Sequence, residues 1–343
     1  MEDYMKVTIE DVAKESGFSI TTVSRVINNN YPVKDETRKR VEEVIDKLNF
    51  HPNILARGLI NQRTDTVGII VPSNTNLFFP IVVKGIDSVL RKKGYTIYLC
   101  DSDNNEEEEI RYAKSLLSRV VDGIIVIDPQ TSNMKNGFYE GISKEVPLVC
   151  INGYNEGIDC NFVLNNEETG AIEAMEYLIS LGHRKIAFVR GEKSYSYDLK
   201  ERVYNEVLDK HHYGEYKKVI NVGYGNKYNT VDTTMETVED VLNNDNHPTA
   251  FFACNDIMAL GVLNACKRAE LNVPGDISVV GFDNIIISNL TEPKITTVDQ
   301  NMYELGENAA QMLLKHIDKH TGKSERIVLN TKLIIRDSCK KIT

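Results

Sequence analysis

Apolar residues in the first fifty positions recur with the spacing of short helices. Val23, Val26 and Ile27 stand at i, i+3 and i+4, and the stretch 41–48 repeats this spacing. Each helix would bury one face and leave the other exposed to solvent. The pattern therefore predicts a small helical bundle over residues 1–50.

Turn and capping residues separate the first two helices of this bundle. Thr8 is followed three residues later by Asp11, which is the capping-box pattern of a helix start. Gly17 stands where the chain must turn sharply, and Ser19 can cap the helix that follows. Two short helices joined by such a tight turn are typical of a helix-turn-helix.

The second helix leaves one face free of apolar side chains. That face carries short polar groups and one long cation, namely Thr21, Thr22, Ser24, Arg25 and Asn28. Side chains of this kind suit a helix that lies in a DNA major groove, where an arginine can also bind a phosphate instead of a base. A three-helix bundle without a DNA role is the alternative interpretation.

From Thr66 onward the pattern changes to apolar strands that alternate with helical stretches. The strands read "TVGIIVP", "TIYLCDS", "GIIVID" and "PLVCIN", and a second round follows with "NFVLNN", "KIAFVRG", "KKVINVG", "AFFACN" and "ISVVGFDN". Continuous apolar strands between helices indicate parallel sheets that are covered on both faces. Two successive rounds predict an α/β body with two doubly wound lobes.

Polar and aromatic residues follow several of these strands directly. In open α/β sheets ligands bind beyond the carboxyl ends of the strands, so these residues should converge on one cleft. Carboxylates, amides and aromatic faces suit a polyhydroxyl ligand. The candidates are Asn76, Phe78, Phe79, Asp128, Asn152, Asn255, Asp256 and Asp283. For Asn255, Asp256 and Asp283, capping of the next helix or turn is the alternative role.

Composition narrows the class of protein. No apolar run reaches the ~20 residues that span a bilayer, and the N-terminus lacks a signal-peptide pattern, so we expect a cytoplasmic protein without membrane contact. Its six cysteines lack the CxxC spacing of a metal site and should be buried and reduced. The net charge is −10, and residues 1–62 hold nine Lys or Arg against ten Asp or Glu. DNA binding therefore requires cations that are gathered on one face.

The chain resembles the lactose-repressor/purine-repressor (LacI/GalR) family of bacterial transcription regulators over almost its whole length. The similarity is carried by "TIEDVAKESGFSITTVSRVIN", "HPNILARGL", "TVGIIVP", "GHRKIAF", "NDIMALGVLNA", "ISVVGFDN" and "ITTV". It implies an N-terminal all-α helix-turn-helix head with a hinge helix, followed by a periplasmic-binding-protein-like body whose chain crosses three times between the lobes. The implied boundaries are 1–50 for the head and 51–65 for the hinge. The N-lobe would comprise 66–161 plus about 293–323, and the C-lobe 162–292 plus about 324–343.

The resemblance also implies which residues bind DNA. In the head, Ile20 and Thr21 would read bases and Arg25 would approach a guanine. In the hinge, Asn53 can cap a short helix that Gly58 weakens by about 1 kcal/mol, so this helix should form only in a pair on DNA. Its Leu59 would then wedge between base pairs, and a plain linker is the alternative. The full set of DNA-binding candidates is Thr8, Ser19, Ile20, Thr21, Thr22, Ser24, Arg25, Asn28, Asn53, Ala56, Arg57 and Leu59.

One departure from the family concerns the effector. Relatives carry an arginine three residues before a glycine, but here Lys200 takes the arginine place and Val203 the glycine place. Arg202 is the alternative cation. Arginine and lysine are not interchangeable at a bidentate site. We therefore expect the effector of this chain to make different contacts from those made by the effectors of such relatives.

We therefore expect a homodimeric repressor of carbohydrate-related genes that binds a pseudo-palindromic operator and a sugar or sugar phosphate. One alternative is a global catabolite regulator with a phosphorylated carrier protein as corepressor, and another is a transport-type sugar-binding protein. "TGKSE" and "GYGNKY" lack the glycines of nucleotide loops, and the latter is interpreted as a turn. No spacing indicates a catalytic set, so we expect no enzyme, no cofactor and no metal.

Overall fold

The computed structural model describes residues 7–28, 31–50, 63–319 and 323–342. The chain divides into two compact units, Met1–Thr64 and Asp65–Thr343. Each unit is described by itself below. In the described ranges, no helix combines the length and the apolar character needed to cross a bilayer.

The first unit contains the three predicted helices α1 (Ile9–Ser16), α2 (Ile20–Asn28) and α3 (Asp35–Leu48). They pack around a small apolar core, whose fully or nearly fully buried members are Val12, Val23, Val26, Val41 and Val44. The helix spacing of these positions in the sequence is thus confirmed. A core of this size holds the helices together without covering the outer face of α2.

The predicted caps of this unit are also confirmed. The Asp11 backbone N–H donates to the Thr8 hydroxyl at 3.3 Å, and the Thr8 backbone N–H donates to the Asp11 carboxylate at 2.8 Å. Gly17 ends α1 with a φ of 79°, a value that glycine adopts without a steric penalty. Ser19 accepts from the Thr22 backbone N–H at 3.2 Å. The predicted hinge helix, with Asn53, Ala56, Arg57 and Leu59, lies outside the described residues.

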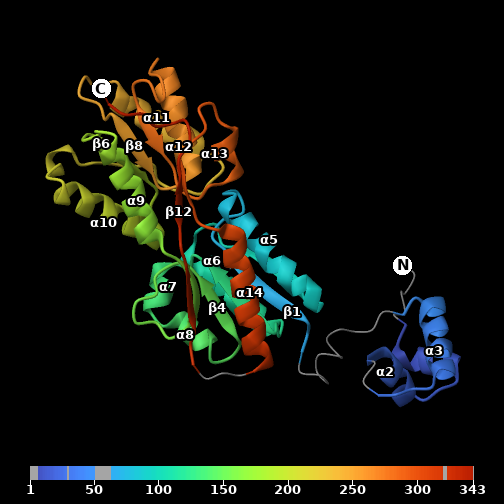
Figure 1. Ribbon diagram of the computed structural model, residues 1–343. Coiled ribbons are helices and arrows are strands. Elements are labelled where there is room, and N and C mark those ends of the chain that lie inside the picture. Colours follow the sequence, from blue (N-terminus) through green and yellow to red (C-terminus); the bar gives the residue numbers. More distant parts are fainter. Residues whose placement is uncertain (1–6, 29–30, 51–62, 320–322, 343) are drawn as a thin grey trace. The chain divides into compact units, whose positions relative to one another are not determined.

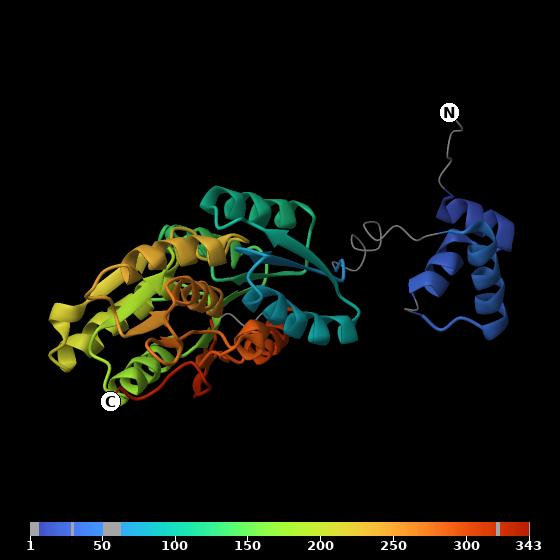
Figure 2. The same ribbon diagram turned by 90° about the horizontal axis from the view of Figure 1, so that it is seen from above.

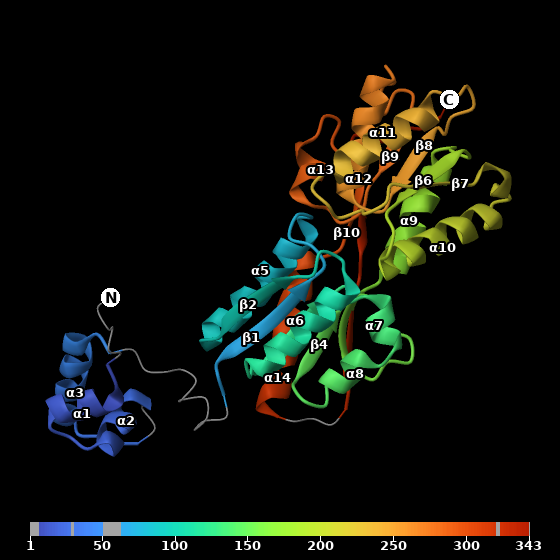
Figure 3. The same cartoon turned by 180° about the vertical axis from the view of Figure 1, so that it is seen from behind.

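The first lobe of the second unit is a six-stranded parallel sheet in the order β11-β5-β4-β3-β1-β2. Helices α5 and α14 cover one face and α6, α7 and α8 the other, and Figures 1 and 3 show this sheet from its two sides. Its elements are β1 (Thr66–Val71), α5 (Phe78–Leu90), η1 (Arg91–Lys93), β2 (Thr96–Asp101), α6 (Glu106–Ser118), β3 (Gly123–Ile127), α7 (Thr131–Lys135), α8 (Phe138–Ile142), β4 (Leu148–Ile151), β5 (Asn161–Asn165), α14 (Met302–Asp318) and β11 (Arg326–Leu329).

The second lobe is a four-stranded parallel sheet in the order β7-β6-β8-β9, with its own apolar core. Its elements are α9 (Glu167–Ser180), β6 (Ile186–Arg190), α10 (Tyr195–Lys210), η2 (Gly214–Tyr216), β7 (Lys218–Asn221), α11 (Thr230–Leu242), β8 (Ala250–Ala253), α12 (Asp256–Arg268), β9 (Ser278–Val280) and α13 (Ile286–Leu290). The last described residues end beside this lobe (Figure 2), where the Ile342 N–H donates to the Leu181 carbonyl.

The chain crosses between the lobes three times, as the resemblance implied. The crossings follow β5, β10 (Thr297–Asp299) and β11, and the antiparallel pair of β10 with β12 (Lys332–Ile334) lies along two of them. A body connected in this way directs the carboxyl ends of both sheets toward the region between the lobes.

The predicted lobe boundaries are wrong in detail. Strand β5, which the sequence assigned to the C-lobe from residue 162, pairs with β4 and β11 in the first sheet. Residues 293–299 bond to the second lobe through the pair Gly281–Thr296, and β11 lies in the first lobe. An apolar strand that is buried on both faces carries no mark of the sheet it joins, because pairing alone decides this.

Helices α5 and α14 approach each other more closely than ordinary side chains would permit. A Cβ atom on Gly85 would lie 2.1 Å from the Tyr303 carbonyl oxygen, and one on Gly306 would lie 2.1 Å from the Val82 carbonyl oxygen. Both obstacles are backbone atoms, which cannot rotate away. The two glycines therefore set the distance between these helices.

We predict that Gly85→Ala destabilises the protein by about 1–3 kcal/mol, because the added methyl group must push α14 away from α5. Gly141→Ala is the matched control, since it lies in α8 and its added Cβ would meet no atom within 4 Å. This control should stabilise the protein by about 0.4–1 kcal/mol. Urea unfolding followed by circular dichroism measures both changes, and equal midpoints for the two variants would contradict this packing.

Candidate functional site

The outer face of α2 presents the predicted DNA-binding side chains to solvent. Ile20, Thr21 and Arg25 are exposed, while Thr22, Ser24 and Asn28 are partly buried. The apolar residues between them face the core of the head. An α-helix with one free polar face of this kind fits into the DNA major groove, where its side chains can contact base edges.

Two contacts restrict the side chains on this face. The Asn28 amide donates to the Ser24 hydroxyl at 3.1 Å. The Arg25 guanidinium lies 5.1 Å from the centre of the Tyr31 ring, within the range of a cation–π contact. Arg25 is thus held beside an aromatic ring while its five N–H donors stay available to a base or phosphate.

A second candidate site is a cavity between the two lobes of the body. The first lobe contributes Asn76, Phe78, Phe79, Asp128 and Asn152, and the crossing segments contribute Glu167 and Gln300. The second lobe contributes Ser194, Ser196, Tyr197, Lys200, Asn226, Cys254, Asn255 and Asp283. Its free volume is about 40 Å³, far below the roughly 300–1,000 Å³ of a typical ligand pocket. The protein's own side chains therefore nearly fill the space between the lobes.

Three of these polar residues have a left-handed backbone conformation: Asp128 and Asn152 directly follow β3 and β4, and Asp283 lies shortly after β9. The φ angles are 46° at Asp128, 55° at Asn152 and 108° at Asp283. Asp and Asn tolerate the left-handed region best among non-glycine residues, whereas the value at Asp283 is strained even for them. Such strain is concentrated at functional sites, so the backbone conformation also indicates a functional site at the carboxyl ends of these strands.

Asn226 connects the two lobes. Its side-chain oxygen accepts from the Asn76 amide at 2.8 Å and from the Tyr197 hydroxyl at 3.1 Å. Its backbone carbonyl accepts from the hydroxyls of Ser73 and Thr75 at 2.8 and 2.7 Å. One residue of the second lobe thus binds three residues of the first.

Further polar contacts span the same gap. The Ser194 hydroxyl donates to the Asp128 carboxylate at 3.1 Å, and the Lys227 ammonium lies 3.7 Å from the Asp103 carboxylate. These contacts join loops rather than packed helices, so separating the lobes exposes polar groups that water can bind. The closed body therefore encloses polar groups between its lobes.

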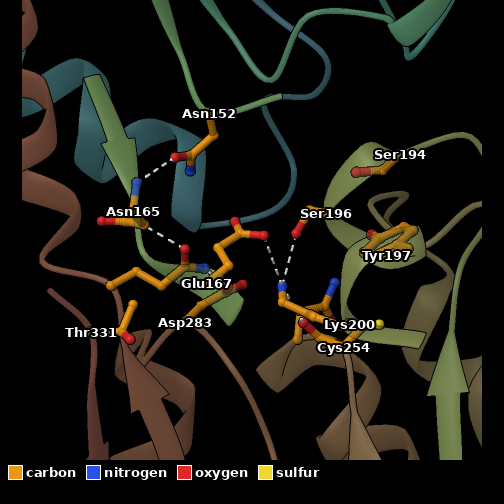
Figure 4. A network of polar contacts seen from close by, with 12 residues as sticks. Asn152, Asn165, Glu167, Ser194, Ser196, Tyr197, Lys200, Cys254, Asp283 and Thr331 are labelled. Atoms are coloured by element: carbon orange, nitrogen blue, oxygen red, sulfur yellow. Dashed lines mark hydrogen bonds and ion pairs between the residues drawn. The ribbon is translucent and has the colours of Figure 1, made fainter. Parts of the chain in front are cut away.

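Lys200 lies buried in the wall of the cavity, on α10 (Figure 4). Its ammonium donates to the Ser196 hydroxyl at 2.9 Å and to the Cys254 carbonyl at 3.3 Å, and it lies 3.9 Å from the Glu167 carboxylate. It also lies 3.8 Å from the centre of the Phe282 ring. Four kinds of partner thus compensate a charge that would be costly to bury alone.

Acidic side chains outnumber basic ones in the lining of the cavity. Burial, with the nearby Glu167 charge, raises the pKa of Asp128 to about 7. Burial raises the pKa of Asp283 well above its usual value, although Lys200 acts against the shift. Burial thus makes both aspartates bind a proton more tightly than they would in water.

The head and the body match two known families. Residues 8–53 match the family described as bacterial regulatory proteins, lacI family, and residues 175–339 match the periplasmic binding protein-like domain. The chain is 37% identical to catabolite control protein A of Priestia megaterium over 98% of this chain and 100% of that protein. It is 32% identical to the ribose operon repressor of Halalkalibacterium halodurans over 97% of each.

The chain belongs to the lacI family of bacterial regulatory proteins.

The fold agrees with this assignment. The crystal structure of the Lac repressor dimer bound to operator and the anti-inducer ONPF superposes with a TM-score of 0.85 at 26% identity, covering 97% of this chain and 99% of that one. This lacI-family chain is accordingly a DNA-binding transcription regulator with a two-lobed body.

The structure brings eight of the ten predicted effector residues of this lacI-family chain into the lining of one cavity. They are Asn76, Phe78, Phe79, Asp128, Asn152, Lys200, Asn255 and Asp283. Asn255 also has the alternative role that the sequence allowed, since its side chain accepts from the Met258 N–H at 2.8 Å and caps α12.

The predictions for Asp256 and Arg202 as effector residues are wrong. The Asp256 carboxylate is buried and accepts from the Ile285 N–H at 2.8 Å and the Thr297 hydroxyl at 2.5 Å, so it holds a turn together. Arg202 is half exposed and pairs with Glu168 and Glu206 on the surface. Two positions along a helix turn a side chain by about 200°, so Arg202 cannot face the same way as Lys200.

Sequence reasoning missed seven residues of the lining: Glu167, Ser194, Ser196, Tyr197, Asn226, Cys254 and Gln300. For Ser194, Ser196 and Tyr197 a signal was available, because they follow β6 as the other site residues follow their strands. Asn226 lies in "GYGNKY", which was interpreted as a turn. That segment carries no periodicity from which its closeness to Asn76 could be inferred.

We predict that Asn226→Ala shifts the body toward an open form, because it leaves the Asn76 amide and the Tyr197 hydroxyl without their shared acceptor. Each such loss costs about 1–3 kcal/mol. Small-angle scattering of the full chain should give a larger radius of gyration than wild type. Asn308→Ala is the control, since Asn308 is partly exposed on α14, outside the cavity lining, and bonds only along its own helix to Glu304 in the described structure. Identical scattering for the two variants would show that the hydrogen bonds of Asn226 do not hold the lobes closed.

Proposed function

We propose that this lacI-family regulator is a repressor of carbohydrate-related genes whose operator affinity depends on a small polyhydroxyl ligand in the interlobe cavity. The observation that carries the proposal is the cavity lining, to which both lobes contribute amides, carboxylates and aromatic rings. A ligand held by both lobes must change how they close. The similarity to the ribose operon repressor supports a carbohydrate as the ligand class.

The proposed DNA contacts lie on α2 and in the hinge. Ser19, Ile20, Thr21, Thr22, Ser24, Arg25 and Asn28 would face the major groove, with Thr8 at the start of α1 near the backbone phosphates. Asn53, Ala56, Arg57 and Leu59 are proposed from the sequence alone. By analogy with the Lac repressor dimer bound to operator, two copies of the chain would bind a pseudo-palindrome in the cytoplasm.

The ligand would act by its different affinity for two arrangements of the lobes. A ligand that binds both arrangements equally changes nothing, however tightly it binds. Closure alters the contacts of Asn226 and Ser194 across the gap. Such a movement would change the spacing of two paired heads, and this role is regulatory rather than catalytic.

A second candidate function is a global catabolite regulator whose corepressor is a phosphorylated carrier protein. The 37% identity to catabolite control protein A favours it. The two functions differ in what alters operator binding. A sugar alone suffices in the first, whereas the second requires a phosphorylated protein partner on the surface of the body.

We predict that Arg25→Ala weakens binding to DNA from upstream of the regulator's own gene by more than it weakens binding to random DNA. An arginine that bonds guanine O6 and N7 contributes about 1–3 kcal/mol of discrimination. Fluorescence anisotropy on the two DNAs, at two salt concentrations, measures the difference.

Lys47→Ala is the matched control in the same head. Lys47 pairs with Glu15 at 2.7 Å, between α3 and α1, and lies off the α2 face. The Lys47→Ala variant should leave the preference for the upstream DNA unchanged. Equal losses on both DNAs for Arg25→Ala would show that Arg25 binds only phosphate and would refute its proposed base contact.

A further inference from the structure

We propose that the ligand of the interlobe cavity carries an amino group, so that the effector is an amine-bearing polyhydroxyl compound rather than a neutral sugar or a sugar phosphate. The inference rests on the proposed function of the cavity and specifies the chemistry of its ligand. Three independent features of the cavity lining support it: the balance of charge, the partners that Lys200 already has, and the aromatic faces beside the acids.

The balance of charge favours a cationic ligand. Asp128, Glu167 and Asp283 all line the cavity, and in the part of the chain that the structure describes Lys200 is the single cation in this lining. Lys200 offsets one carboxylate, Glu167, at 3.9 Å. Lys200 also acts on Asp128 and Asp283, so one ammonium is shared among three acids. A ligand phosphate would add a further negative charge to a poorly hydrated space, which is strongly unfavourable.

The hydrogen-bonding capacity of these acids points the same way. A carboxylate can accept about four hydrogen bonds. In the described contacts, the Asp128 carboxylate accepts from Ser194 and the Asp283 carboxylate accepts from Gln300 at 2.6 Å. Acceptor sites on both groups are therefore available for donors on the ligand. An ammonium group supplies three donors and a positive charge at one atom.

Lys200 demonstrates that this wall can hold an ammonium group. Its Nζ is surrounded by a carboxylate, a hydroxyl, a backbone carbonyl and the face of Phe282. Asp128, the Ser194 hydroxyl and the rings of Phe78 and Phe79 also line the cavity and offer the same kinds of group. Those two rings lie edge to face with centres 5.3 Å apart. Carboxylates next to aromatic faces are a favourable environment for an ammonium ion.

Binding of an amine should release protons near neutral pH. The charged groups that act on Asp128 are Glu167 on α9, Lys200 on α10 and Glu109 on α6. Since the pKa of Asp128 is about 7, a nearby ammonium would lower that pKa and displace the proton. The affinity for the amine should then rise as the pH rises through 7, as long as the ligand amine stays protonated. A neutral sugar places no charge beside Asp128 and should show no such linkage.

The test is isothermal titration calorimetry on the full-length chain with matched ligands. D-glucosamine, D-galactosamine and D-mannosamine are each compared with the parent hexose, and a hexose phosphate and galacturonate serve as anions. We expect at least one amine to bind about tenfold more tightly than its parent, or better. Its binding enthalpy should depend on the ionisation enthalpy of the buffer, because protons are released. The anions should bind more weakly than either.

Two variants locate the effect. Asp128→Asn should reduce the ratio of amine to parent affinity toward one and abolish proton release. Asp198→Asn is the control, because Asp198 is an exposed acid on α10 that pairs with Arg190 outside the cavity lining. This control should keep the wild-type ratio. The inference is overturned if no amine binds better than its parent at millimolar concentration, if an anion binds best, or if Asp128→Asn keeps the preference.

Operator anisotropy on the same samples separates this inference from the proposed function. If a neutral sugar or an anion alters operator binding, ligand control through the cavity stands and the amine preference fails. If no ligand of any charge alters operator binding, the proposed ligand control fails as well. An amine that both binds and alters operator affinity supports the two together.

Discussion

The threefold crossing of the chain between the lobes is the constraint on which the rest of the structure depends. Because the crossings follow β5, β10 and β11, the polar residues after the strands of both sheets face one another. Each lobe can then keep an apolar core of its own while polar groups collect between the lobes. Asn226 uses this arrangement, since its carbonyl and its amide side chain bind three residues of the opposite lobe. Closure thus combines these hydrogen bonds with an apolar contact, in which Ile257 and Ile285 of the second lobe join the core of the first.

The charge of the cavity follows from the same constraint. The left-handed positions after strands favour Asp and Asn, and two of the three acids in the lining, Asp128 and Asp283, occupy such positions. Their burial between the lobes raises the pKa of each aspartate, so each binds a proton more tightly than in water. The compact ammonium of Lys200 is satisfied by its own neighbours. The lining thus places three acids around one cation.

Features that repeat along the chain could be predicted from the sequence, whereas features that depend on pairing in space could not. Helix spacing and a capping box located α1 to α3, the residues that follow strands located seven cavity residues, and the family resemblance located Lys200. The lobe to which β5 belongs was misjudged because an apolar strand does not show its partner. Asn226 was missed because a loop has no periodicity. Asp256 and Arg202 were misplaced because the sequence shows neither the partners of a buried carboxylate nor the direction of a side chain.

The central claim is that a ligand in the cavity and DNA at the heads act on one equilibrium. The most direct test measures the affinity of one cavity ligand for the full-length chain when it is free and when it is saturated with operator DNA. Linkage requires the operator to change the ligand affinity by the same factor by which the ligand changes operator affinity. The account predicts equal factors different from one. A ligand that binds the free and the DNA-bound protein with the same affinity would contradict it.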